Sequence, residues 1–262
     1  MKKTVVALLI GSIILAPLCA GGSKESAAPA KKTEILISAA ASLKNCIQDL
    51  SAMYTEKNPQ VTITSNFGAS GALQQQIEQG APADVFFSAG IKQMNALKEK
   101  GMMLDSSVKN ILENKVVLIT PKSAAALDSF EALAGDSIKK IGVGEPKSVP
   151  VGQYTEQIFQ NLGLTDKVAS KLIFAKDVRE VLSWVETGNV DAGVVYETDA
   201  KISQDVTICS TAPEGSHKKV IYPIGVVKAS AHAAEAQKFV DFLFSDAAKE
   251  VFARYGFTVI SK

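Results

Sequence analysis

From residue 33 onward, short runs of β-branched and other apolar residues alternate with segments in which apolar residues recur every three or four positions. The first kind of run is typical of buried strands, and the second is typical of amphipathic helices. Strands are expected at 35–37, 61–65, 84–88, 115–120, 141–143, 172–174, 192–196 and 220–227. Helices are expected from residue 42 and over 70–79, 91–97, 152–162, 177–187, 233–244 and 246–255.

The alternation of strands and helices predicts an α/β fold with parallel-rich sheets flanked by helices. The chain has 262 residues, which is longer than a typical single domain, so two lobes are expected. Ligands of open α/β sheets bind beyond the carboxyl ends of the strands. A binding site is therefore expected at the turns that join strands to helices.

The first twenty residues have the pattern of an export signal. Lys2 and Lys3 precede a mostly apolar run at 5–16, which is too short to span a bilayer comfortably. The mature protein is therefore expected to be periplasmic or otherwise extracytoplasmic.

The end of this signal allows two interpretations. Cys19 stands at the end of the apolar run and is followed by small and polar residues, as in a bacterial lipoprotein signal that would anchor the protein to the membrane. Leu18 departs from that pattern, which has a small residue before the cysteine, and ordinary cleavage after Ala20 is the alternative. Residues 21–32 lack large apolar side chains and predict a flexible tether.

Composition excludes several classes of protein. Hydrophobic residues make up 47% of the chain, which is enough for a sizeable core and excludes wholesale disorder. A formal net charge of +1 argues against nucleic-acid binding. Three cysteines are too few for a disulfide framework. Cys46 lies beside the apolar positions of a predicted helix and is expected to be a buried thiol. A disulfide between Cys46 and Cys209 is the alternative, which spacing alone does not test.

Four of the expected turns place small residues, hydroxyls or free backbone amides at the start of a helix. Such helix N-termini have unpaired N–H groups and a partial positive charge, so they can bind anions. Each residue also has a purely structural interpretation, because Ser42, Ser70 and Asp177 are good N-caps and Tyr196 suits a half-buried packing position. The turns lie at 39–42, 67–71, 148–152 and 176–179.

Catalytic alternatives have weaker support. Ser70 misses the G-x-S-x-G pattern of hydrolases by one position. A serine hydrolase also needs a histidine, and His217 and His232 are both expected at the surface. An exported serine hydrolase that uses Ser70 is kept as a rival hypothesis, and a sensory binding lobe is another.

Several motifs, in the same order along residues 35–258, resemble the molybdate-binding proteins (ModA family) of ABC transporters. These motifs stand at 37–43, 80–86, 177–179, 194–196, 216–219, 222–223 and 254–257. The resemblance implies a two-lobed periplasmic-binding-protein fold of type II with the ligand cleft between the lobes.

The same resemblance places the lobe boundaries. It implies that 33–116 together with 222–262 form the first lobe and that 117–221 form the second. The two crossings between the lobes are expected near 114–120 and 217–224.

The resemblance also implies a set of oxyanion ligands. Carried over by motif, Ser42 and Ser70 donate through side chain and amide, Val151 and Val178 donate through the amide, and Tyr196 donates its hydroxyl. Val151 stands where alanine often follows the proline. Molybdate or tungstate is then held through its oxygens, with no direct metal-cation ligand and no cofactor.

The implied function is capture of molybdate or tungstate by a monomer that delivers it to an inner-membrane ABC permease, without catalysis and without nucleic acid. A site that offers only donors suits an unprotonated oxyanion and disfavours phosphate, which often keeps a proton. A sulfate-class oxyanion stays an alternative, because cavity size discriminates between sulfate and molybdate and the sequence does not give it.

Overall fold

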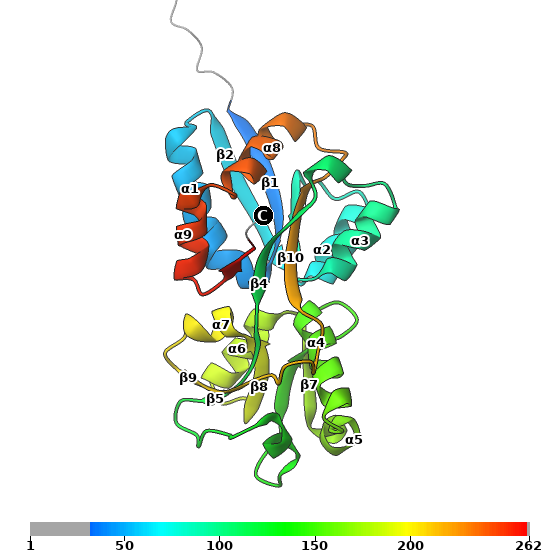
Figure 1. Ribbon diagram of the computed structural model, residues 1–262, viewed down its shortest axis with the longest axis vertical. Helices are drawn as coiled ribbons and strands as arrows, with labels where there is room; N and C mark the ends of the chain where they lie inside the picture. Colours follow the sequence, from blue (N-terminus) through cyan, green and yellow to red (C-terminus); the bar gives the residue numbers. More distant parts are fainter. Residues whose placement is uncertain (1–31, 261–262) are drawn as a thin grey trace, which may run out of the picture. The chain divides into compact units, whose positions relative to one another are not determined.

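The computed structural model describes residues 32–260. These residues form two sheets flanked by helices, and each sheet is the centre of one lobe (Figure 1). The strand order is β11-β4-β10-β3-β1-β2 in the first sheet and β7-β6-β8-β5-β9 in the second. The predicted two-lobed α/β fold is confirmed. The predicted export signal, Cys19 and nearly all of the predicted tether lie outside the described residues.

The first lobe starts with three parallel strands, each followed by a helix. Their inner residues, such as Ile35, Ile37 and Val85, are fully buried, as expected for strands covered on both faces. Helices α1 and α9 lie side by side (Figure 1), joined by an ion pair between Arg254 and Asp49. The elements are β1 (Thr33–Ala40), η1 (Ala41–Leu43), α1 (Lys44–Lys57), β2 (Val61–Gly68), α2 (Ser70–Glu78), β3 (Val85–Phe87), α3 (Ile91–Glu99), η2 (Asp105–Ser107), β4 (Lys109–Asn114), β10 (Val220–Val226), α8 (Ala233–Phe242), α9 (Asp246–Arg254) and β11 (Thr258–Val259).

The second lobe is built around β6, β7 and β8, which are parallel. Helix α6 contacts β6 and β8, and its residues Val181 and Val185 are fully buried. The elements are β5 (Val116–Pro121), η3 (Phe130–Ala134), β6 (Ile141–Gly144), α4 (Pro150–Asn161), α5 (Thr165–Val168), η4 (Ala169–Lys171), β7 (Leu172–Ala175), α6 (Val178–Glu186), β8 (Ala192–Tyr196), α7 (Glu197–Lys201) and β9 (Val206–Thr211).

The strand predicted at 115–120 is present as β5, whereas β4, which precedes it with only Lys115 between them, was not predicted. The chain thus passes from the first sheet directly into the second, as Figure 1 shows. No helix reverses the chain at this point, so β5 runs antiparallel to β8, and β10 runs antiparallel to β3. Both sheets are therefore mixed, with a parallel group of three strands in each, where the sequence predicted parallel-rich sheets.

The two described cysteines are free thiols in different lobes. Cys46 in α1 is buried, as predicted, and its Sγ donates to the Leu43 carbonyl at 3.1 Å. Burial raises the pKa of this thiol. Cys209 lies on β9 and is partly exposed. The disulfide that the sequence left open does not form.

No helix within residues 32–260 combines the length and the apolar character that crossing a bilayer requires.

Candidate functional site

One small cavity is lined by all five residues predicted to bind an oxyanion. Ser42 and Ser70 come from the first lobe, and Val151, Val178 and Tyr196 come from the second. The volume open to the centre of a water-sized sphere is about 10 Å³, which is roughly the room of one water. The cavity is therefore suited to a compact ligand.

Ser70 is the first residue of α2, directly after the carboxyl end of β2. The N-cap of α2 is Ala69 and no side chain caps this helix, so the N-cap interpretation of Ser70 is wrong. Ser70 is fully buried, and its Oγ accepts a hydrogen bond from the Ala89 amide at 2.9 Å. Since the oxygen is used as an acceptor there, the hydroxyl hydrogen is left to donate toward the cavity.

Ser42 lies in η1, directly after β1. The N-cap of η1 is Ala40, again without a side-chain hydrogen bond, so the N-cap interpretation of Ser42 is also wrong. Its Oγ lies 3.0 Å from the phenolic oxygen of Tyr222 in β10. Tyr222 belongs to the recognised motif at 222–223, but sequence reasoning assigned it no role at the site, because it stands within an apolar strand run at 220–227.

Two helix starts in the second lobe provide backbone amides as further hydrogen-bond donors. Helix α4 begins at Pro150 without a side-chain cap, and Val151 is the next residue. Helix α6 is capped as predicted, with Asp177 Oδ1 accepting the amides of Arg179 and Glu180 at 2.9 and 3.0 Å. The first-turn amides of a helix have no partner within it, so the amides of Val151 and Val178 are available to an anion.

Tyr196 ends β8 and is only 1% exposed, so the alternative interpretation as a half-buried packing residue is wrong. Its hydroxyl donates to the Ala89 carbonyl at 3.5 Å, which is at the limit for a hydrogen bond. Burial raises the pKa of Tyr196 well above its ordinary value, so the phenol keeps its proton. The group can therefore serve a ligand as a donor.

A buried ion pair stands directly behind Ser42. Arg179 Nε lies 2.6 Å from Asp199 Oδ1, and the Asp199 side chain is fully buried. Arg179 Nη2 donates to the Ser42 carbonyl at 3.3 Å, from the second lobe to the first. Burial raises the pKa of Asp199 to about 6, although the Arg179 guanidinium opposes this shift. Arg179 is part of a recognised motif at 177–179, but the sequence gave no signal for Asp199.

Two further contacts join the lobes beside the cavity. The amide of Gly71, in the first turn of α2, donates to the Ser148 carbonyl at 2.9 Å. A Cβ atom at Gly71 would lie 2.5 Å from that oxygen. The side chains of Gln93 and Gln153 approach to 3.4 Å. The described lobes thus contact each other closely around the cavity.

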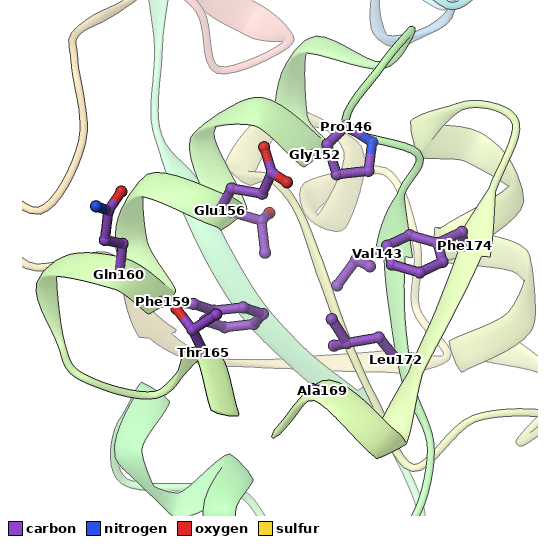
Figure 2. Close-up of a pocket in the computed structure, with 11 residues that line it drawn as sticks. Val143, Pro146, Gly152, Glu156, Phe159, Gln160, Thr165, Ala169, Leu172 and Phe174 are labelled. Atoms are coloured by element: carbon purple, nitrogen blue, oxygen red, sulfur yellow. The ribbon is translucent and has the colours of Figure 1, made fainter. Parts of the chain in front are cut away.

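A larger hollow of about 450 Å³ lies within the second lobe, away from these residues. Figure 2 shows Val143, Phe159 and Leu172 turned toward it, with Glu156 near its rim. Apart from the glycine at 152, it contains nothing from the predicted turns. The small cavity between the lobes is therefore the candidate site.

Comparison with known protein families covers nearly the whole described chain. A family model for bacterial extracellular solute-binding proteins matches residues 35–258. The chain belongs to this family. Members of this solute-binding family are transport proteins of the extracytoplasmic space, which agrees with the predicted localisation.

Individual family members are similar over most of their length. The chain is 44% identical to an ABC transporter substrate-binding lipoprotein named YvgL of Bacillus subtilis, over 87% of each chain. It is 39% identical to the molybdate-binding protein ModA of Haemophilus influenzae, over 94% of this chain and 97% of that one. The structure of the periplasmic molybdate-binding protein of Azotobacter vinelandii aligns with a TM-score of 0.79 at 23% identity, over 87% of this chain and 100% of that one, which shows a shared fold. The ModA-like family predicted from the motifs is confirmed.

Proposed function

We propose that this solute-binding protein captures molybdate, and also tungstate, outside the cytoplasm and delivers it to an ABC permease in the inner membrane. The observation that carries the proposal is the convergence of Ser42, Ser70, Val151, Val178 and Tyr196 on one cavity between the lobes. Every group that these residues offer is an uncharged hydrogen-bond donor. The similarity to molybdate-binding ModA proteins supports the choice of anion.

Aligned dipoles can compensate the charge of the anion. Removing a dianion from water costs a large hydration energy. Hydrogen bonds to a charged group contribute about 1.5–3 kcal/mol each, so about seven of them contribute roughly 10–20 kcal/mol before the entropy of association is subtracted. Nanomolar affinity needs about 12 kcal/mol. The proposed donor set can therefore hold the anion without a cationic ligand.

Ligands drawn from both lobes make the anion a bridge that favours the closed arrangement. A tetrahedral oxyanion is larger than one water, so the lobes have to open to admit it before they close around it. We expect the permease to recognise the closed, loaded form. We also expect the protein to act as a monomer, without nucleic acid and without a resident cofactor or metal cation.

Ser70 is unsuited to the rival role of a catalytic nucleophile. Its Oγ accepts the Ala89 amide, whereas His217 Nδ1 contacts the Lys218 carbonyl. A nucleophilic serine needs a base within hydrogen-bond reach, and no histidine among the described residues hydrogen-bonds to Ser70. This supports binding without catalysis.

Thermal unfolding with a panel of oxyanions tests the proposed function. A ligand at 1,000 times its dissociation constant adds about 4.1 kcal/mol to the free energy of unfolding. Molybdate and tungstate are expected to raise the melting temperature by several degrees, while sulfate and phosphate have little effect. An equal response to sulfate would replace the molybdate assignment by a sulfate-class one.

A matched pair of variants ties the response to the cavity. Ser42→Ala removes one donor and is expected to reduce the shift caused by molybdate. Ser210→Ala, on β9 and away from the cavity lining, is expected to leave it unchanged. Equal shifts in both variants would remove Ser42 from the site.

We further propose that Cys19 carries a lipid anchor, which the name of the lipoprotein YvgL supports. Cells expressing Cys19→Ala are expected to release the protein into the soluble extracytoplasmic fraction, while the unchanged protein sediments with membranes. Fractionation with antibody detection measures this difference. Soluble protein in both cases would favour ordinary cleavage after Ala20.

A further inference from the structure

A chain of hydrogen bonds leads from a crossing between the lobes to the hydroxyl of Ser42. Asn114 is the last residue of β4, just before the chain enters the second lobe. Its Nδ2 lies 3.2 Å from the phenolic oxygen of Tyr222, which in turn lies 3.0 Å from Ser42 Oγ. Tyr222 is fully buried, so water does not replace these partners.

The side chain of Asn114 determines which atoms donate and which accept along this series of hydrogen bonds. The Lys115 amide donates to Asn114 Oδ1 at 2.8 Å, which identifies the other side-chain atom as the NH₂ group. An NH₂ group can only donate, and this one donates to Tyr222 and to Thr198 Oγ1, the latter at 2.9 Å. The phenolic oxygen of Tyr222 is therefore an acceptor from Asn114.

The single hydrogen of the Tyr222 hydroxyl is then left for Ser42. Burial raises the pKa of Tyr222 well above its ordinary value, so this hydrogen is present at neutral pH. Ser42 Oγ accepts it, and the one hydrogen of the Ser42 hydroxyl is free to point into the cavity. Ser70 is constrained in the same way by the Ala89 amide.

We propose that Tyr222 is a positioning residue that holds Ser42 as a donor toward the ligand and so helps the site to select oxyanions without a proton. This inference rests on the proposed function of the cavity. An oxyanion that carries a hydroxyl, such as hydrogen phosphate, needs an acceptor at one point of the site. Each serine instead uses a lone pair for a protein donor and directs its hydrogen to the cavity, and Asp177 Oδ1 on the cavity wall is used as the cap of α6, where it accepts two amides.

Tyr222→Phe keeps the ring and removes only the hydroxyl, so Ser42 gains freedom to accept as well as to donate. We expect molybdate affinity to fall about tenfold, which corresponds to part of one hydrogen bond to a charged group. The ratio of the dissociation constants for hydrogen phosphate and molybdate is expected to fall as well, because the barrier against a ligand hydroxyl is removed. Calorimetric titration at mildly alkaline pH, where both ligands are dianions, measures the two constants.

Asn114→Asp is a second variant that reverses the direction of the chain. A carboxylate can only accept, so Tyr222 would donate to residue 114 and Ser42 would donate to Tyr222. The oxygen of Ser42 would then face the cavity as an acceptor. The added charge repels both dianions alike, so the ratio of the two dissociation constants isolates the reversal and is expected to fall further than in Tyr222→Phe.

Tyr255→Phe is the matched control, since its hydroxyl donates to Asp49 on the outer surface. It should change neither affinity nor ratio. Weaker molybdate binding with an unchanged ratio in Tyr222→Phe, or no change at all, would overturn the inference while leaving the proposed function intact. Failure of the unchanged protein to bind molybdate would overturn both. Melting temperatures of the ligand-free variants confirm that each one folds.

Discussion

Replacing Gly71 by alanine is expected to weaken molybdate binding about ten- to a hundredfold without destabilising the ligand-free protein. The new Cβ would lie 2.5 Å from the Ser148 oxygen and 2.8 Å from its Cα, both of which are backbone atoms of the other lobe. Relief of such overpacking costs about 1–3 kcal/mol, which corresponds to the expected loss of affinity. The lobes relieve the clash by separating, so the cost falls on the closed form that binds the anion.

Helix α2 itself should tolerate this change, because alanine is favoured over glycine by about 1 kcal/mol inside a helix. Gly68→Ala is the matched control, since it adds the same methyl group at a residue that lines the cavity but meets only the Leu73 side chain of its own lobe, at 3.7 Å. Calorimetry gives the affinities and chemical denaturation gives the stabilities. Equal affinity losses in the two variants would show that cavity filling, rather than closure, is responsible.

Arg179→Met is expected to lower the free energy of unfolding of the ligand-free protein by about 3–5 kcal/mol at neutral pH, the usual cost of leaving one member of a buried ion pair alone. Asp199 already has its pKa raised to about 6 by burial, with Arg179 opposing the shift. Without the guanidinium this pKa rises further, so the ionised carboxylate is held in the core at a greater cost.

The effect of this variant should depend on pH with a defined sign. A carboxyl whose pKa is raised on folding contributes stability that is complete below its unfolded pKa and is lost as the pH rises through the folded value. The difference between Arg179→Met and the unchanged protein should therefore shrink as the pH falls from 7 to about 5, because Asp199 is protonated in both folded proteins at the lower pH. Denaturant titrations at both pH values measure this difference.

Arg254→Met supplies the comparison at the surface. Arg254 pairs with Asp49 at 2.8 Å, but both side chains are largely exposed, and such pairs contribute about 0–1 kcal/mol. If Arg179→Met and Arg254→Met lower the free energy of unfolding by similar amounts, the buried pair does not contribute more to stability than the surface pair.

Local sequence patterns were sufficient to find the turns that hold the cavity residues. Helices α2, α4 and α6 begin within two residues of the predicted positions, because small or polar residues directly follow buried strand runs there. The choice of ligands among those turns came from the family resemblance. The donors of Ser42 and Ser70 face a cavity, whereas the pattern of each serine alone also suited an N-cap.

Local sequence patterns could not predict the contacts between residues that are far apart along the chain. Tyr222 is separated from Ser42 by 180 positions, and Arg179 from Ser42 by 137, so neither contact leaves a periodic signal. Strand β4 contains Lys109, Asn110 and Asn114, which disfavour an isolated strand, and it forms because β10 and β11 pair with it on both sides. The formation of β4 thus depends on pairing with distant strands and not on its local strand propensity.

The position of Asn114 at the crossing has a consequence for unloading the cargo. Its amide group contacts Tyr222 in its own lobe and Thr198 in the second lobe, so rotation of the lobes about this strand changes the distance to Thr198 and loosens the amide group that orients Tyr222. When the lobes open, the hydroxyl of Ser42 then loses its fixed orientation while the proposed ligands of the second lobe move away from the anion. Release of the anion to the permease should therefore depend more steeply on opening than it would if only the contacts from the second lobe were lost.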